Sequence, residues 1–240
     1  MSSDNGAPAN DLAANPSTTP TASSSLAAVR DRLLRMAGRV EQMIAESQSA
    51  LVGRDVALAG RVIDLDQEVN QAELDIDEMC LAVLARGQLS SADLRFVTLA
   101  MKMVTDLERI ADLAVNICER AIDLASANGI VVHPDIPRMS VLVRDLVRRA
   151  IDAFVDRDVD KARTVIEKDD EVDTYYRVIF GDLLQQMQVQ PEGLNEWIHV
   201  QSVAKWLERM GDHATNLAEL VIFMVQGRDV RHPALRSAER

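Results

Sequence analysis

The chain of 240 residues carries 38 acidic and 26 basic residues, for a formal net charge of −12. Because nucleic-acid binding depends on Lys and Arg neutralising phosphates, this charge argues against a nucleic-acid partner. Hydrophobic residues make up 48% of the chain and aromatic residues 3%, a composition typical of packed Ala, Leu and Val helices.

Neither end of the chain nor its interior suggests export or insertion into a membrane. No apolar run approaches the roughly 18 residues that a membrane span needs. The N-terminus lacks the basic flank and apolar core of a secretion signal. Cys80 and Cys118 are too few for a disulfide framework, and both lie in apolar helical sequence. We therefore expect a cytoplasmic protein with two reduced thiols in its core.

The first predicted elements are a tail and a long helix. Residues 1–24 are mainly Ser, Thr, Ala, Pro, Asn and Asp, which bury too little to offset the entropy of ordering. We predict a disordered tail there. Apolar residues then recur at spacings of three and four from Leu26 to Ile44, which indicates a helix. Gly53 is expected to end this helix before Asp55 caps the next one.

The second and third helices are separated by a glycine and a capping box. The second is predicted to run from about Asp55 to Arg86 and to end at Gly87. Ser90-Ser91-Ala92-Asp93 resembles a capping box and begins a third helix, which continues to about Ala127. Residues 130–138 contain two prolines and are predicted to form a linker.

The same arrangement of three helices then repeats. No alternating strand pattern or hairpin dipeptide competes with the helical periodicity. The predicted fold class is all-α, with six long antiparallel helices in two tandem, duplicated three-helix bundles. The remaining boundaries are helices over 139–157, 160–188 and 191–226, a first bundle over 25–129, a second bundle over 139–228 and a C-terminal tail over 229–240.

Two segments of the chain match each other at a constant offset. Thr105–Glu119 aligns with Lys205–Glu219, and the pattern Glu-Arg-x-x-Asp-x-x-x-Asn-x-x-Glu is identical in both copies. The preceding helices also match, since residues 62–70 align with residues 165–173. A duplicated three-helix unit explains this self-similarity.

The matched residues place oxygen-bearing side chains on one face of each helix. Spacings of four, four and three residues put a set of four side chains on adjacent turns, namely Glu108, Asp112, Asn116 and Glu119. On the helix before, Asp66 and Asn70 are also four residues apart. Like charges at this spacing destabilise a helix by roughly 0.2–0.5 kcal/mol per pair. A hard cation would compensate, because it prefers carboxylate and amide oxygens as ligands.

A solvated acidic face is the alternative interpretation. In this alternative, an arginine of each copy pairs with the aspartate three residues on, Arg109 with Asp112 and Arg209 with Asp212. Two observations favour metal: the pattern recurs at the equivalent place in each half, and apolar residues lie beside Glu108 on its helix. Residue chemistry alone leaves both interpretations open.

The doubled motif, Leu-Glu-Arg-Ile-Ala-Asp in one half and Leu-Glu-Arg-Met-Gly-Asp-His in the other, resembles the signature of the PhoU family, as does Val221–His232. The resemblance extends from about Leu26 to His232. It implies two similar three-helix bundles and, in some members, Glu/Asp-x-x-x-Asp motifs that hold iron clusters or other divalent cations (Fe, Zn, Mn or Mg). By residue, it implies metal ligands at Glu108, Asp112, Glu208, Asp212, Asp66, Asn70, Asp169 and Asp173, with Asn116 and Asn216 as secondary candidates.

The resemblance also implies a function. Family members are accessory regulators of bacterial phosphate-specific transport, so we expect a non-enzymatic repressor of phosphate-starvation signalling. Its implied partners are a phosphate-sensing histidine kinase and the ATPase of a phosphate ABC transporter, and a homodimer is implied as well. Partners would recruit the protein to the inner face of the membrane. Asn70 replaces an acid that the family pattern leads us to expect, which predicts a weaker first metal site.

Two other function classes remain open. One is a di-metal oxidase or hydrolase built on the same carboxylates, and the other is a metal-free helical scaffold. Glu196 and His199 have the Glu-x-x-His spacing of di-iron bundles, but such enzymes need the motif on two helices and no second copy occurs. His213 directly follows Asp212, so it should point about 100° away from it and lie on the outer face.

Overall fold

The computed structural model describes residues 22–87, 89–126 and 132–227. Within these ranges the protein is entirely helical, which confirms the predicted fold class. The predicted tails at 1–24 and 229–240 lie outside the described residues, apart from 22–24. The elements are α1 (Ala22–Gly53), α2 (Val56–Ala85), α3 (Ser91–Ala125), α4 (Ile136–Asp156), α5 (Val159–Val189), the 3-10 helix η1 (Pro191–Gly193) and α6 (Leu194–Gln226).

Side-chain caps fix the starts of three helices. The Asp55 carboxylate accepts a hydrogen bond from the backbone N–H of Leu58, and the Ser90 hydroxyl accepts one from Asp93. Asp158 caps α5 in the same way as Asp55 caps α2. Each Asp follows an arginine in the left-handed conformation, with φ of 51° at Arg54 and 53° at Arg157. The two halves therefore reuse one turn between their first and second helices.

Three predicted boundaries were wrong. Helix α1 begins at Ala22, so residues 22–24 of the predicted tail are helical. Helix α4 begins at Ile136 rather than 139, because Pro137 sits in its first turn, where no backbone N–H is needed. The last residues of the predicted linker are thus helical. Pro191 starts the single turn of η1, and α6 itself begins at Leu194.

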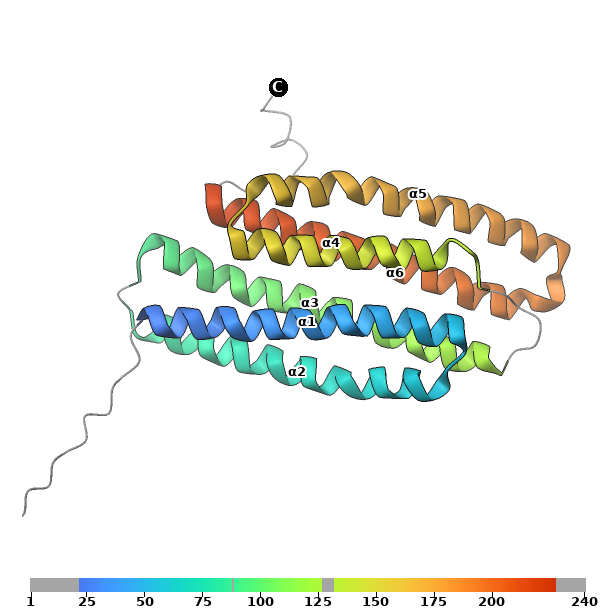
Figure 1. Cartoon of the computed structure of the whole chain (residues 1–240), viewed down its shortest axis with the longest axis horizontal. Helices are drawn as coiled ribbons and strands as arrows, with labels where there is room; N and C mark the ends of the chain where they lie inside the picture. The colour runs from blue at the N-terminus through green and yellow to red at the C-terminus, as the bar shows by residue number, and fades with distance from the viewer. Residues whose placement is uncertain (1–21, 88, 127–131, 228–240) are drawn as a thin grey trace, which may run out of the picture.

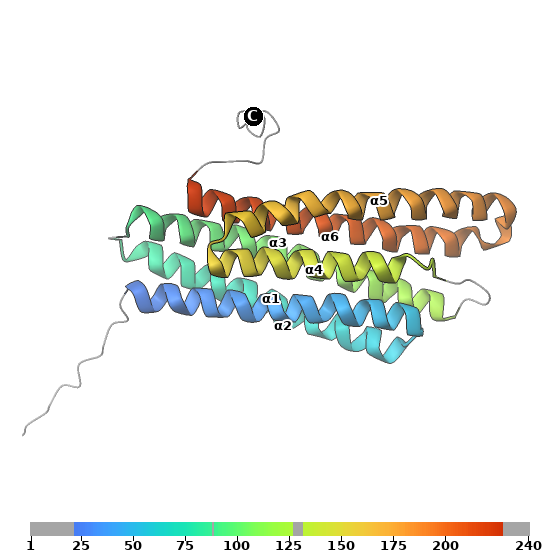
Figure 2. The same cartoon turned by 45° about the horizontal axis from the view of Figure 1, so that its top comes forward.

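The two three-helix bundles lie side by side (Figures 1 and 2). Helices α1, α2 and α3 pack on one another, as do α4, α5 and α6, while α3 packs along α6 and α1 along α4. Helices α3 and α6 each bury fifteen residues, whereas α2 buries seven and α5 five. Helices α3 and α6 therefore form the centre, and α2 and α5 lie at opposite long edges.

The core of both bundles is mainly apolar, and the buried polar residues of the described chain are Ser47, Ser140 and Glu219. Cys80 and Cys118 are fully buried in it, as predicted. Burial raises the pKa of the Cys80 thiol to about 11 and that of Cys118 to about 12, so both stay protonated. Across the described ranges, no helix combines the length and apolarity that a membrane crossing requires.

Candidate functional site

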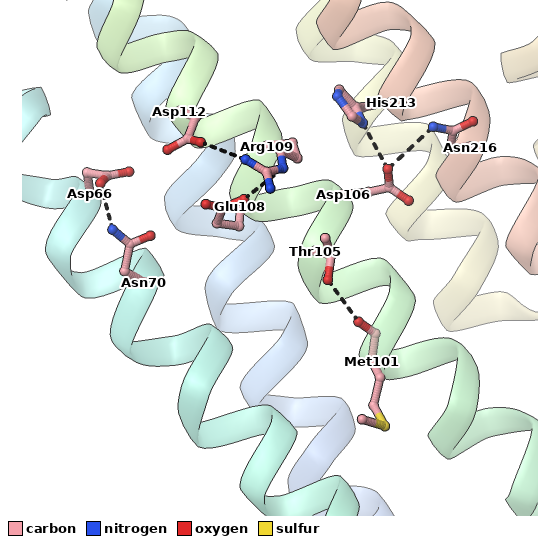
Figure 3. Close-up of polar contacts among 10 residues, drawn as sticks. All are labelled: Asp66, Asn70, Met101, Thr105, Asp106, Glu108, Arg109, Asp112, His213 and Asn216. Atoms are coloured by element: carbon pink, nitrogen blue, oxygen red, sulfur yellow. Dashed lines mark hydrogen bonds and ion pairs between the residues drawn. The ribbon is translucent and has the colours of Figure 1, made fainter.

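The first acidic cluster lies between α2 and α3. We define it as Asp66 and Glu73 of α2 with Glu108 and Asp112 of α3. Burial raises the pKa of Glu108, and the neighbouring carboxylates of Asp112 and Glu73 raise it further. Burial also raises the pKa of Asp66, with a further rise from Asp112. Three of the four carboxylates, Asp66, Glu73 and Glu108, are thus partly desolvated. Figure 3 shows Asp66 on α2 with Glu108 and Asp112 on α3.

This cluster is only partly neutralised by its neighbours. Arg109 Nε lies 3.4 Å from Glu108 Oε2, and its Nη1 lies 3.4 Å from Asp112 Oδ2. The pairing of Arg109 with Asp112 is the one that a solvated acidic face predicts. Asn70 Nδ2 donates to Asp66 Oδ2 at 2.8 Å, while Asp66 Oδ1 is buried without a hydrogen-bond partner. This buried carboxylate oxygen therefore accepts no hydrogen bond from the described residues.

The second acidic cluster lies between α5 and α6. We define it as Asp169 and Asp173 of α5 with Glu208 and Asp212 of α6. Burial and the nearby Asp212 carboxylate raise the pKa of Asp169 to about 6. Burial raises the pKa of Asp212 as well, and Glu208 adds to this rise. The predicted carboxylates of the second half thus lie near one another between α5 and α6, at the place equivalent to the first cluster between α2 and α3.

In the second cluster, the basic side chain that contacts the acids is Lys205 rather than the arginine of the repeated motif, Arg209. Lys205 Nζ donates to Glu208 Oε1 at 2.7 Å and to Oε2 at 2.6 Å. The pairing expected between Arg209 and Asp212 is not among the contacts of the described residues. The two halves therefore have carboxylates at equivalent positions, but the basic side chains that pair with them differ in type and in position.

Both clusters fit a hard cation by the chemistry of their donors. All eight side chains present carboxylate oxygens. Burial first, and neighbouring carboxylates after it, raise the pKa of five of them, namely Asp66, Glu73, Glu108, Asp169 and Asp212. Among the residues described here, however, no three His, Cys, Asp or Glu side chains converge on one point as metal ligands do. A bound cation would have to draw the two helices' side chains together.

The secondary candidate Asn216 lies in a different contact. Its Nδ2 donates to Asp106 Oδ1 of α3 at 3.4 Å, so it faces the opposite bundle. Asn116 is half-buried on α3. The placement of His213 on the outer face was wrong, since its Nδ1 lies 2.8 Å from Asp106 Oδ1 and its side chain is only 19% exposed. Asp106, His213 and Asn216 join the two bundles (Figure 3).

The Glu-x-x-His of α6 takes part in a different contact. His199 Nδ1 lies 3.1 Å from Arg120 Nη1. The guanidinium nitrogen donates, so this ring nitrogen accepts, and a nearby positive charge disfavours a metal ion there. This geometry agrees with interpreting the Glu196–His199 spacing as a coincidence.

Two residues of these sites were missed in the sequence. Glu73 lies seven residues after Asp66, which places it on the same side of α2, and this spacing could have identified it. Its counterpart in the second half is Tyr176, so the repeat gave no signal. Asp106 corresponds to Trp206 and pairs with a residue more than a hundred positions away, which no local pattern reveals.

Comparisons with known proteins cover most of the chain. The PhoU domain model matches twice, over residues 33–121 and 136–221. The chain is 40% identical over 212 residues to the phosphate-specific transport system accessory protein PhoU homolog of Pseudomonas putida, covering 87% of this chain and 82% of that protein. A homolog of the same name from Pseudomonas aeruginosa is 39% identical over 211 residues, covering 86% of each chain.

A solved structure extends this similarity to the fold. The crystal structure of PhoU from Pseudomonas aeruginosa superposes with a TM-score of 0.84 at 36% identity, covering 87% of this chain and 100% of that one. Its agreement covers both bundles and their relative placement. Together with the two domain matches, these findings show that the chain belongs to the PhoU family.

Proposed function

We propose that this chain is an accessory protein of phosphate-specific transport that limits phosphate uptake and represses phosphate-starvation signalling. The observation that carries the proposal is the similarity, over both bundles, to relatives named for that transport system. The protein would work on the cytoplasmic side of the membrane, as a homodimer, and without catalysing a reaction.

The proposed mechanism is contact with a sensor histidine kinase and with the ATPase of the phosphate transporter. The outer helices offer the surface for such contacts. Helix α2 carries seven acidic residues against one basic residue, and α5 carries seven against four. Complementary charge steers association and selects partners. The acidic helices α2 and α5 therefore favour partner surfaces that are rich in Lys and Arg.

We further propose that divalent cations bind the two acidic clusters and regulate these contacts. Asp66, Glu108 and Asp112 would hold a cation in the first half, with Asn70 as a neutral donor. Asp169, Asp173, Glu208 and Asp212 would hold one in the second. When bound, the cation supplies positive charge, which relieves the repulsion between carboxylates. The carboxylates themselves, coming from two helices in each half, then connect α2 to α3 and α5 to α6.

A capture experiment in a bacterium that lacks its own PhoU-family protein tests the function. The full chain, expressed with an affinity tag, should restore repression of a phosphate-starvation reporter at high phosphate. It should also capture the sensor kinase and the transporter ATPase. Restored repression without either partner would contradict the contact mechanism, and no repression would contradict the function.

Charge variants on the outer helices provide the matched control for this experiment. Glu78 and Glu167 are exposed acids of α2 and α5 outside both acidic clusters. Glu78→Lys with Glu167→Lys should reduce capture, because the substitutions reverse charge on the proposed contact surface. Glu78→Gln with Glu167→Gln should reduce it less. Equal capture by wild type and both variants would show that these edges are not the contact surface.

A further inference from the structure

The second acidic cluster depends on a glycine that the first lacks. A Cβ atom at Gly211 would lie 2.6 Å from Asp169 Oδ1 and 3.3 Å from Val172 Cγ1. Carboxylate oxygens do not approach a Cβ so closely, so the Asp169 carboxylate occupies space that any other residue at 211 would fill. The helical glycines Gly38, Gly60 and Gly181 have open space at the same position. Within the described chain, the close approach is specific to the helical glycine beside the cluster.

The first half is built differently at the equivalent position. Ala111 stands where the second half has Gly211, and Asp66 corresponds to Asp169. The first half thus has a Cβ atom at the position where the second half has the open space of Gly211. Asp66 accepts a hydrogen bond from the neighbouring Asn70 of its own helix. The duplicated carboxylates are therefore held in two different ways.

We propose that Gly211 is a positioning residue that lets Asp169 reach α6 beside Asp212, and that this makes the second acidic cluster the stronger site for a hard divalent cation. The inference rests on the proposed function only in the identity of the ligand. The steric dependence of Asp169 on Gly211 stands on geometry alone. Residues that orient a ligand typically change metal affinity by about 10- to 100-fold when substituted, without touching the metal.

A metal-free experiment tests the steric part in the full chain with a chelator present. Replacing a helix-interior glycine by alanine normally stabilises a protein, so Gly60→Ala and Gly181→Ala should raise the denaturant midpoint. Gly211→Ala should lower it, and this loss should shrink when Asp169 is also replaced by Ala. If Gly211→Ala alone does not fold, recovery of folding in the double variant supports the same conclusion. An equal loss in both backgrounds, or no recovery, overturns the proposal.

A Mn²⁺ titration tests the cation part. The background is the full chain carrying Glu108→Gln and Asp112→Asn, which remove the charge of two carboxylates of the first cluster. In this background, Gly211→Ala should weaken Mn²⁺ binding by at least about tenfold. In a background that also carries Asp169→Ala, Gly211→Ala should add no further loss, because the side chain that it displaces is already absent. Additive losses would mean that Gly211→Ala acts through helix packing, and would overturn the proposal.

The reciprocal variant separates the two proposals. With the second cluster silenced by Glu208→Gln and Asp212→Asn, Ala111→Gly should bind Mn²⁺ at least as tightly as the unmodified first cluster. Weaker binding would contradict the steric comparison between the halves. A wild-type chain that takes up no Mn²⁺ refutes the cation sites themselves, whereas uptake that Gly211→Ala leaves unchanged refutes only the role of Gly211.

Discussion

At the scale of single residues, the acidic clusters have a measurable energetic cost. Asp169 has a pKa raised from its ordinary 3.8 to about 6, because it is partly buried and lies beside Asp212. Between these values Asp169 binds more protons in the folded chain than in the unfolded chain. Its contribution to the unfolding free energy therefore falls as pH rises from about 4 to 6. Without metal, this carboxylate destabilises the protein at neutral pH.

We expect Asp169→Asn to remove this pH dependence. In the presence of a chelator, the variant should be more stable than wild type by about 1–2 kcal/mol at pH 7, after allowance for solvent screening. The difference should vanish near pH 4, where the wild-type carboxyl is protonated. Denaturant titrations at several pH values measure this, with Asp170→Asn as control, since Asp170 is exposed on the same turn. A stability difference that is the same at pH 4 and pH 7 would contradict the assignment.

The contact between Asp106 and His213 can also be tested by substitution. Removing one partner of a half-buried hydrogen bond costs about 1 kcal/mol. Asp106→Ala should therefore lower the unfolding free energy at neutral pH by about this amount. Lys102→Ala, an exposed substitution one turn earlier on α3, should have little effect. If the two substitutions have equal effects, this contact does not hold the bundles together.

At the scale of elements, helix boundaries set by local chemistry could be predicted and others could not. The caps at Asp55 and Ser90 were found because a side chain bonds to a backbone group two or three residues on. The start of α4 was missed because Pro137 is tolerated in a first turn, although the same residue commonly marks a linker. Pro191 starts a separate 3-10 turn rather than α6.

The contribution of the α5 N-cap to stability can be tested by substituting Asp158. Asp158 accepts hydrogen bonds from the backbone N–H groups of Asp160 and Lys161 at 3.0 Å each. Asp158→Ala should destabilise the protein by about 1 kcal/mol, because these two donors lose their partner. Asp158→Asn keeps an acceptor and should lose less. Thermal unfolding compares the two variants, and equal losses would mean that the cap is not responsible.

At the scale of the whole molecule, the duplication explains what the sequence could reveal about the site. All four carboxylates of the second cluster were predicted, but only three of the first: Glu108, Asp112, Glu208 and Asp212 repeat exactly, so their pattern stood out. Glu73 does not repeat and was missed. The role of Gly211 could not be seen either, because it depends on how closely α5 packs against α6, which residue spacing does not encode.

The two bundles therefore have the same arrangement of helices. They differ in the basic and amide side chains that contact each cluster and in the space between the two helices that carry it. The first has Arg109 and Asn70 at its carboxylates, and the second has Lys205 and the open position at Gly211. Because an acid replaced by Asn lowers the charge of a site, these differences predict unequal affinities for a divalent cation.

Counting the Mn²⁺ ions bound to the purified full chain shows whether the paired acidic clusters hold hard divalent cations. We expect at least one ion in each cluster, with the tighter class of sites lost in the variant carrying Glu208→Gln and Asp212→Asn. The weaker class should be lost in the variant carrying Glu108→Gln and Asp112→Asn. Unchanged uptake in both variants, or no uptake by the wild-type chain, would contradict cation binding by these clusters.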